Sequence, residues 1–195
     1  MNLIKQALNT LKNKWQISLA LGSTAALIMT ATYYIPVIGG VIIAIEVFIF
    51  QQLIQKLVFN SYAFKASKHL PAVLVIGILF FPSLLLMGSG DTLLLNRYAI
   101  SNLPTAFIIY ILVSMIFFFL EIALELRIQK NLSLIKALDS SGLKLFGNLK
   151  SLFLLSFYSG ALLLIGKISW GLGYVIALPL ISIAAHLFFQ QEVKE

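Results

Sequence analysis

The sequence contains no cysteine, so disulfide bonds, thiolate catalysis and cysteine-ligated metals are all excluded. Histidine is nearly absent as well, since only His69 and His186 occur, too few and too far apart for a histidine-rich metal site. Charged residues make up 11% of the chain, whereas they make up about 25% of an average soluble domain. We therefore predict a protein without a metal or cofactor, and with too little polar surface for a water-soluble fold.

Hydrophobic residues are correspondingly abundant, at 60% of the 195-residue chain. A helix needs about 20 predominantly apolar residues to cross a bilayer. Six stretches reach or approach that length, namely residues 15–35, 37–55, 70–88, 103–126, 149–166 and 171–189. We predict an all-α fold, with one integral membrane domain over residues 1–195. It is expected to be a polytopic transmembrane bundle of six spanning helices in three hairpins, with interfacial amphipathic helices.

Proline and glycine mark the expected ends of these helices. Residues 89–91 read Ser-Gly-Asp and are predicted to open the second hairpin. Pro71 and Pro104 are predicted at helix starts, where a missing N–H costs nothing. Pro82 and Pro179 lie inside spans and are predicted to kink them.

The basic residues are distributed unevenly about the predicted spans, and this indicates the orientation. Of 14 lysines and arginines, only Arg97 and Lys167 fall on one side, and all others fall on the opposite side. Because cytoplasmic loops retain Lys and Arg, the lysine-rich side, which holds both termini, is predicted to be cytoplasmic. The net charge of +7 is accordingly attributed to lysine at the inner leaflet, with the lipid bilayer as partner and no nucleic acid.

The chain also contains signs of an internal repeat, with units at residues 1–59, 60–130 and 131–191. Residues 3–8 resemble residues 134–138, and each segment precedes a predicted hairpin. Residues 50–52 and 189–191 both read Phe-Gln-Gln, while residues 54–56 and 128–130 both read Ile-Gln-Lys. Chance similarity in an apolar sequence is the alternative explanation. Repeats arranged in this way run in the same direction along the chain.

The segments at residues 3–15 and 134–149 place apolar side chains at helical spacing, opposite lysines. Ser133 is a candidate N-cap for the second of these segments. An amphipathic helix with lysines on its polar face lies flat on an anionic leaflet. The alternative function of these segments is to dock a protein partner within a membrane complex.

Polar residues inside predicted spans are the first candidates for a functional site. Glu46 lies near the middle of the second span, where it is either protonated or faces a hydrated cavity. Tyr158 and Ser114 are its depth-matched candidate partners. Either a functional role or a hydrogen bond between packed helices would explain Glu46.

A second group of polar residues lies nearer the cytoplasmic side. Glu121 and Glu125 are one helical turn apart and share a face of the fourth span. His186 on the sixth span has a similar depth, so Glu121 and His186 are predicted to pair, as a proton relay or as a bond between helices. Glu125 is predicted at the membrane surface, paired with Arg127 or Lys130.

Small residues recur at every fourth position of the first span, at Ser18, Gly22, Ala26 and Thr30. Such a ridge lets a neighbouring helix approach closely. We predict that these residues serve helix packing.

The last third of the chain contains the segments SLIKALDSSGLKLFGNLKSLFLLSFYSGALLLIG and GLGYVIALPLISIAAHLFFQQ. Their pattern is an amphipathic segment, a hairpin, a Gly-x-Gly and an intramembrane proline, and it rests on Ala137, Leu138, Lys144, Asn148, Gly171, Gly173 and Pro179. In this pattern the chain resembles a loose group of bacterial six-span inner-membrane proteins, which includes the membrane domain of some glycerophosphodiester phosphodiesterases. The resemblance implies a bacterial cytoplasmic (inner) membrane location. It implies no activity, because no soluble phosphodiesterase domain is present in this sequence.

Two kinds of function fit these observations best. The first is a non-enzymatic membrane component that belongs to a membrane complex, maintains the envelope or interacts with lipid. The alternative is a small-molecule or ion transporter, or its substrate-binding subunit, that uses a polar cluster within the bundle. An enzyme is not expected, because no catalytic constellation is evident in the sequence.

Overall fold

The computed structural model describes residues 2–33, 38–59, 66–95, 99–168 and 173–192. The described residues are almost entirely helical, with no strand among them, so the all-α prediction is confirmed for this part of the chain. The helices are α1 (Asn2–Asn13), α2 (Trp15–Tyr33), α3 (Ile38–Phe59), α4 (Ala66–Leu95), α5 (Ala99–Lys130), α6 (Leu134–Gly147), α7 (Leu149–Ile168) and α8 (Tyr174–Glu192).

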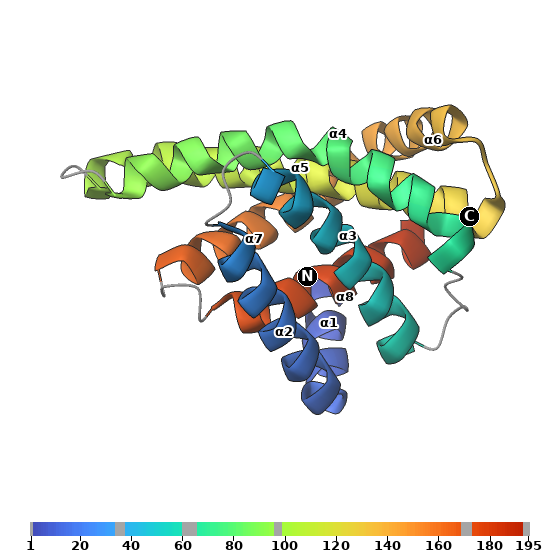
Figure 1. The fold of residues 1–195 in the computed structure, drawn as a ribbon, viewed down its shortest axis with the longest axis horizontal. Helices are drawn as coiled ribbons and strands as arrows, with labels where there is room; N and C mark the ends of the chain where they lie inside the picture. The colour runs from blue at the N-terminus through green and yellow to red at the C-terminus, as the bar shows by residue number, and fades with distance from the viewer. Residues whose placement is uncertain (1, 34–37, 60–65, 96–98, 169–172, 193–195) are drawn as a thin grey trace.

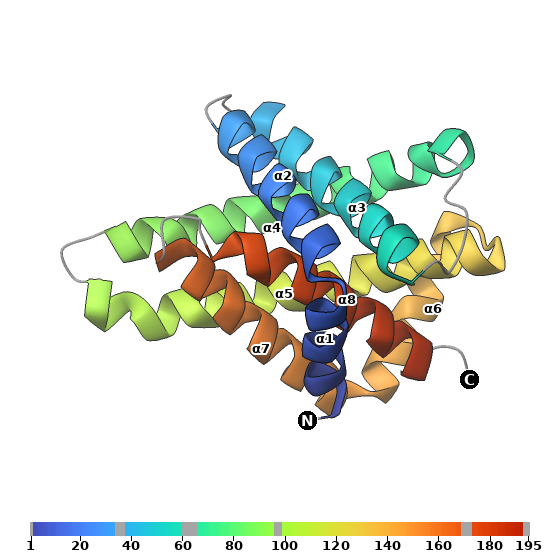
Figure 2. The same ribbon diagram turned by 90° about the horizontal axis from the view of Figure 1, so that it is seen from below.

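Six of the helices form a closed ring (Figures 1 and 2). Around the ring, α2 packs against α3, α3 against α4, and α4 against α5. The ring continues from α5 to α7 and from α7 to α8, and α8 packs against α2 to close it. Helix α8 also packs across the ring against α3 and α5. The two short helices lie outside the ring, α1 against α8 and α6 against α5.

Among the described residues, four helices are long and apolar enough to cross a membrane, over Val41–Phe59, Leu70–Leu94, Ser101–Lys130 and Leu149–Ile168. The last of these corresponds to the shortest predicted span, which the structure lengthens to 20 residues as α7. Helix α8 contains a shorter apolar stretch, Val175–Gln191. Helix α2 begins where the first span was predicted to begin, at Trp15.

Helix α4 continues through the segment in which the sequence predicted a turn. It includes Ser89 and Asp91 and ends only at Leu95. The Ser89 hydroxyl donates to the carbonyl of Leu86 at 2.6 Å, and the Thr92 hydroxyl donates to that of Ser89 at 2.7 Å. Because these polar side chains bond back to the helix, the segment extends α4, and the prediction of a turn at this point was wrong.

Two prolines predicted at helix starts lie further inside their helices. Helix α4 begins at Ala66, five residues before Pro71, and α5 begins at Ala99, five residues before Pro104. Each proline is the sixth residue of its helix, just past the first four N–H groups that have no intrahelical partner, so each removes one backbone hydrogen bond from the start of the helix.

Each short helix is followed almost directly by a long one. A single residue, Lys14, separates α1 from α2, and a single residue, Asn148, separates α6 from α7. Across the first break the Ser18 N–H donates to the Lys14 carbonyl, and across the second the Leu152 N–H donates to that of Asn148. The order of a short helix, a one-residue break and a long apolar helix therefore occurs twice, in the first and third predicted units.

Three glycines mark the closest approaches between ring helices. A Cβ added to Gly22 of α2 would lie 2.1 Å from the Val175 carbonyl oxygen of α8. A Cβ on Gly77 of α4 would lie 2.9 Å from Ile45 Cα of α3, and one on Gly160 of α7 would lie 3.0 Å from Ile111 N of α5. In each case the absence of a side chain allows two helix backbones to meet.

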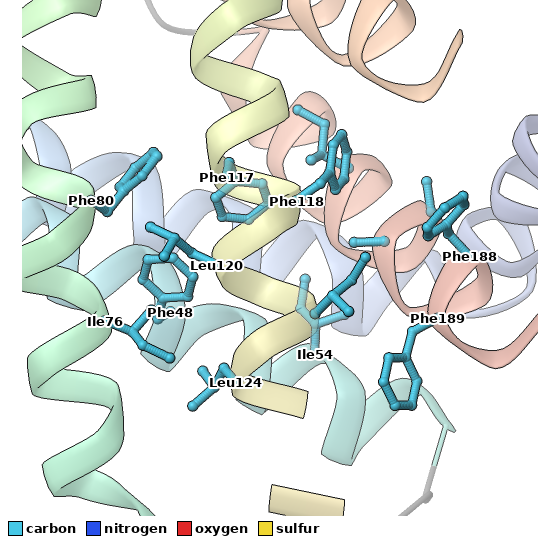
Figure 3. Packing of buried hydrophobic residues seen from close by; sticks show 14 of the residues in the cluster. Phe48, Ile54, Ile76, Phe80, Phe117, Phe118, Leu120, Leu124, Phe188 and Phe189 are labelled. Carbon is cyan, nitrogen blue, oxygen red and sulfur yellow. The ribbon is translucent and has the colours of Figure 1, made fainter. Parts of the chain in front are cut away.

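Aromatic rings fill the interior between α3, α4 and α5 (Figure 3). Phe48 stacks on Phe117 with ring centroids 5.6 Å apart, and Phe80 packs edge-on against both rings. Phe188 and Phe189 of α8 continue this core on the side of α8 (Figure 3). These phenylalanines belong to one core that α3, α5 and α8 share, and those of α5 and α8 lie close in sequence to the buried polar residues Glu121 and His186.

Candidate functional site

Helices α3, α5 and α8 end at the same end of the ring, as contacts near their last turns show. Phe59 of α3 packs on His186 of α8 with ring centroids 4.3 Å apart, and Glu125 of α5 bonds to the same histidine. Lys56, Arg127 and Lys130 lie in the last turns of α3 and α5. We call this the basic end.

The candidate site at the basic end is an acid–imidazole pair enclosed by protein. His186 Nδ1 lies 3.0 Å from Glu125 Oε1, and both side chains are 0% exposed. The residues come from α5 and α8, which meet inside the ring. A buried carboxylate is strongly disfavoured unless it is paired and hydrogen-bonded. The imidazole supplies such a partner, and either member of the pair can hold the shared proton.

Two glutamines complete the hydrogen bonding of the pair. Gln190, one turn after His186, places its amide nitrogen 2.8 Å from His186 Nε2. Gln129, one turn after Glu125, donates from its amide nitrogen to Glu125 Oε2 at 3.3 Å. If Gln190 donates, Nε2 accepts, so the ring proton lies on Nδ1 and points at Glu125. The network thus favours one histidine tautomer, while Phe59 restrains the ring from its face.

The pairing of these acidic residues differs from the prediction. The bond that the structure shows for His186 is to Glu125, whereas the sequence predicted Glu121 as its partner, and Glu125 is fully buried within the protein. Arg127, one of its predicted partners, donates instead to the Leu132 carbonyl at 2.7 Å. Glu121 is also buried, one helical turn from Glu125. The sequence did not predict this partner because it depends on where α8 packs against α5, which places His186 beside Glu125.

Glu46 and its predicted partners do not come together. Glu46 is half-buried on α3, and its Oε2 atom is buried without a hydrogen-bond partner among the described residues. Ser114 is buried but donates to the Tyr110 carbonyl of its own helix at 2.9 Å. Tyr158 is 43% exposed and points out of the ring, which corrects its predicted place inside. Small residues, Ser159 and Gly160, take the inward face of α7 beside it.

The predicted ridge of small residues on α2 lies partly within the described structure. Ser18 is buried, and Gly22 forms the close approach to α8. The side chains of Ala26 and Thr30 fall outside the described residues. Helix α7 carries the same spacing in Ser156 and Gly160, which face inward against α5.

A second polar cluster, absent from the predictions, lies at the opposite end of the ring. Lys167 Nζ of α7 lies 2.7 Å from Asp91 Oδ2 of α4, and the Tyr110 hydroxyl of α5 donates to the other oxygen of Asp91. Asp91 thereby links three helices. The available signal was the opposite charge of Asp91, in the predicted turn of the second hairpin, and Lys167, one of the two basic residues on that side, but 76 residues separate them.

Within the described residues, no three histidine, aspartate or glutamate side chains are grouped so that they could hold a metal ion. The donors and acceptors that the described residues supply here are one imidazole, two carboxyl groups and the flanking amides. Such a set can hold or transfer a proton, or it can bond two helices together.

Comparisons with known proteins give no relative from which a role could be transferred. Neither a protein-family model, nor a curated protein, nor a solved structure matches this chain.

Proposed function

We propose that this chain is an integral membrane protein of non-enzymatic type, a membrane-complex, envelope or lipid-interacting component. The observation that carries this proposal is the outer surface of the ring. Large apolar side chains are exposed along α4, α5 and α7, including Ile78, Leu85, Ile108, Leu112 and Ile165. In water such a continuous apolar surface would be an aggregation site, whereas in a bilayer it is the surface that lipid requires.

We infer six spanning helices, because α2 and α8 lie in the same ring as the four long apolar helices. The four long apolar helices share one closed ring with α2 and α8, which have 19 residues each. At a rise of about 1.5 Å per residue, 19 residues reach about 28 Å, close to the thickness of a hydrocarbon core. An even number of crossings returns both termini to one side, in keeping with the bond between Gln6 of α1 and Gln191 of α8.

The lysines of the basic end support a cytoplasmic location for that end, by the positive-inside rule. The resemblance of the last third to bacterial six-span inner-membrane proteins supports a bacterial cytoplasmic membrane. We propose both on these grounds, together with three units that each contribute two spans.

The topology can be tested with single cysteines, because the chain has none of its own. In intact membrane vesicles, Lys130→Cys at the basic end and Thr92→Cys at the opposite end should react with a charged maleimide from opposite sides. Ile108→Cys, on the outer face of α5, should react from neither side. Reaction of Ile108→Cys as fast as that of Lys130→Cys would contradict the spanning assignment.

The buried pair supports a second candidate function, a proton-linked transporter. Ionisable groups inside a membrane bundle are expensive and are often retained for transport, and Glu125 with His186 forms such a group. Proteoliposomes with an internal pH dye test this candidate. Glu125→Gln should abolish proton flux, while Glu46→Gln, on α3 and outside the network, should retain it. Wild-type flux no higher than that of empty liposomes would reject transport.

A further inference from the structure

Helix α6 is fixed to α5 by one face only. Ala137, Ser141 and Leu145, four residues apart, are buried, and the Ser141 hydroxyl donates to the Phe119 carbonyl of α5 at 2.7 Å. The N-terminus is capped by Ser133, whose hydroxyl accepts from the Lys136 N–H. The position of α6 on α5 is therefore well defined.

Another flank of α6 carries large apolar side chains that none of the described residues covers. Ile135 is 80% exposed and Phe146 is 74% exposed. Eleven residues, about three helical turns, separate them, so both project in nearly the same direction. The next part of the surface is basic, with Lys136 exposed and Lys144 half-buried, and Lys150 follows at the start of α7. Helix α6 thus has three zones: a face on α5, a flank that is apolar except for the exposed Asp139 one turn after Ile135, and a lysine-bearing face.

The level of α6 follows from the helices on either side of it. Helix α5 has 32 residues, or about 48 Å at 1.5 Å per residue, which exceeds a hydrocarbon core of about 30 Å by about 18 Å. The segment of α5 from Phe119 to Lys130, against which α6 folds back, is about 16 Å long. With the core beginning near Leu103, as the sequence predicts, about 30 Å of core ends near Ala123, so Phe119 lies about 6 Å inside the core and the residues after Ala123 lie at the headgroup level. Asn148 alone then separates α6 from α7, the next span.

We propose that α6 is an in-plane anchor for anionic phospholipid at the basic end. Ile135 and Phe146 enter the acyl region, and Lys136, Lys144 and Lys150 contact the phosphate-bearing headgroups. This inference rests on the proposed membrane location. Lipid is the favoured occupant because the flank is held at the bilayer surface by a span at each end, and because its lysines complement a negative leaflet. A protein or a second copy of the chain would have to displace that lipid.

The position of the flank is tested by fluorophores on single cysteines in nanodiscs of phosphatidylcholine with phosphatidylglycerol. A probe at Phe146→Cys should be quenched by lipid-borne quenchers and protected from iodide, while a probe at Lys136→Cys should show the reverse. Equal access of iodide to both positions would overturn the proposal. If Ile108→Cys on α5 remained protected at the same time, the spans would still stand and only the role of α6 would fail.

The lipid class is tested by retention of phosphatidylglycerol against phosphatidylcholine on the purified protein. Each basic residue near an anionic surface contributes about 1 kcal/mol, or about fivefold in affinity, so Lys136→Gln with Lys150→Gln should lower the preference by at least that factor. Lys12→Gln with Lys56→Gln removes the same charge away from α6 and should have a smaller effect. Equal losses in the two pairs would overturn the assignment to α6.

A protein occupant gives a different result. Protection of Phe146→Cys in native membranes, but not in nanodiscs of the purified protein, would show that a protein partner covers the flank. Protection only at several copies per disc would show that a second copy covers it. Either result would overturn the lipid assignment.

Discussion

At the residue scale, the Glu125–His186 pair combines complete burial with complete hydrogen bonding. His186 is held at both ring nitrogens, by Glu125 and Gln190, and Gln129 bonds the other carboxylate oxygen. A buried polar network of this kind stabilises only while all its members are present, since a single deletion leaves a desolvated group without its partner.

We therefore expect Glu125→Ala to destabilise the protein by about 1–3 kcal/mol, the cost of an unsatisfied buried group. Glu125→Gln can still accept from His186 Nδ1 and should lose less. Thermal unfolding in detergent, followed by Trp fluorescence, measures the difference. Equal stability of wild type and Glu125→Ala would show that the pair contributes nothing to the fold.

Gly22 illustrates how a single missing side chain positions two helices. Gly22→Ala would place a Cβ 2.1 Å from a backbone oxygen of α8, so the helices must separate, at a cost of about 1–3 kcal/mol. Gly88 of α4 is the matched control, because an added Cβ meets nothing within 4 Å there. Gly88→Ala should raise stability by up to about 1 kcal/mol through helix propensity. Similar melting temperatures for the two variants would contradict this close approach.

At the element scale, the turn between α5 and α6 depends on one residue with a left-handed backbone. Asn131 has φ 51°, the only non-glycine residue with positive φ among those described. Asparagine tolerates this region, whereas a β-branched residue does not. We expect Asn131→Gly to be tolerated and Asn131→Val to cost about 1–2 kcal/mol. Limited proteolysis at the turn, compared between the two variants, measures its loosening; equal cleavage would argue against a strained turn.

The Asp91–Lys167 salt bridge links α4 to α7 at the end of the ring opposite the basic end. The two side chains are partly exposed, so we expect either Asp91→Asn or Lys167→Met to cost at most about 1 kcal/mol. The exchange of both, Asp91→Lys with Lys167→Asp, should recover part of that loss because the opposite charges meet again. A double-mutant cycle, followed by melting temperature, gives the interaction energy between the two side chains. Additive losses would show that the salt bridge contributes no stability.

At the scale of the whole molecule, the ring is closed by contacts between the two ends of the chain. Helix α2 packs on α8, and Gln191 donates to Gln6 of α1 at 2.8 Å. Each other neighbouring pair in the ring is joined by the chain itself, so this seam depends on packing alone. The other two boundaries between predicted units are packed in the same way. Gly77 of the second unit meets Ile45 of the first, and Gly160 of the third meets Ile111 of the second, as Gly22 of the first meets Val175 of the third.

Closure can be tested by cross-linking in the cysteine-free chain. Gln6→Cys with Gln191→Cys should be joined by a short bismaleimide within one molecule. Gln6→Cys with Thr92→Cys, at opposite ends of the ring, should not. Gel mobility before and after cleavage between the two positions distinguishes intramolecular from intermolecular products. Cross-linking only between molecules would indicate that the ends meet in an oligomer and not within one ring.

The sequence alone determined where the helices lie. Long apolar runs predicted the long apolar helices to within a few residues, except at α4, where Ser89 and Thr92 bond back to their own helix. The amphipathic periodicity of residues 3–15 and 134–149 predicted helices there, and the structure places α1 and α6 over these segments, with Ala7, Ala137 and Leu145 buried. Ser133 was identified as an N-cap from its position alone.

Only the tertiary structure decided which polar residues meet. A spanning helix is apolar on all sides, so its sequence contains little information about which face turns inward. For that reason Tyr158 was expected inside and lies outside, and His186 was expected to pair with Glu121 and pairs with Glu125. The rotation and crossing of such helices are determined by close packing, here by glycines and phenylalanines, and that packing brings residues far apart in the chain within hydrogen-bonding distance.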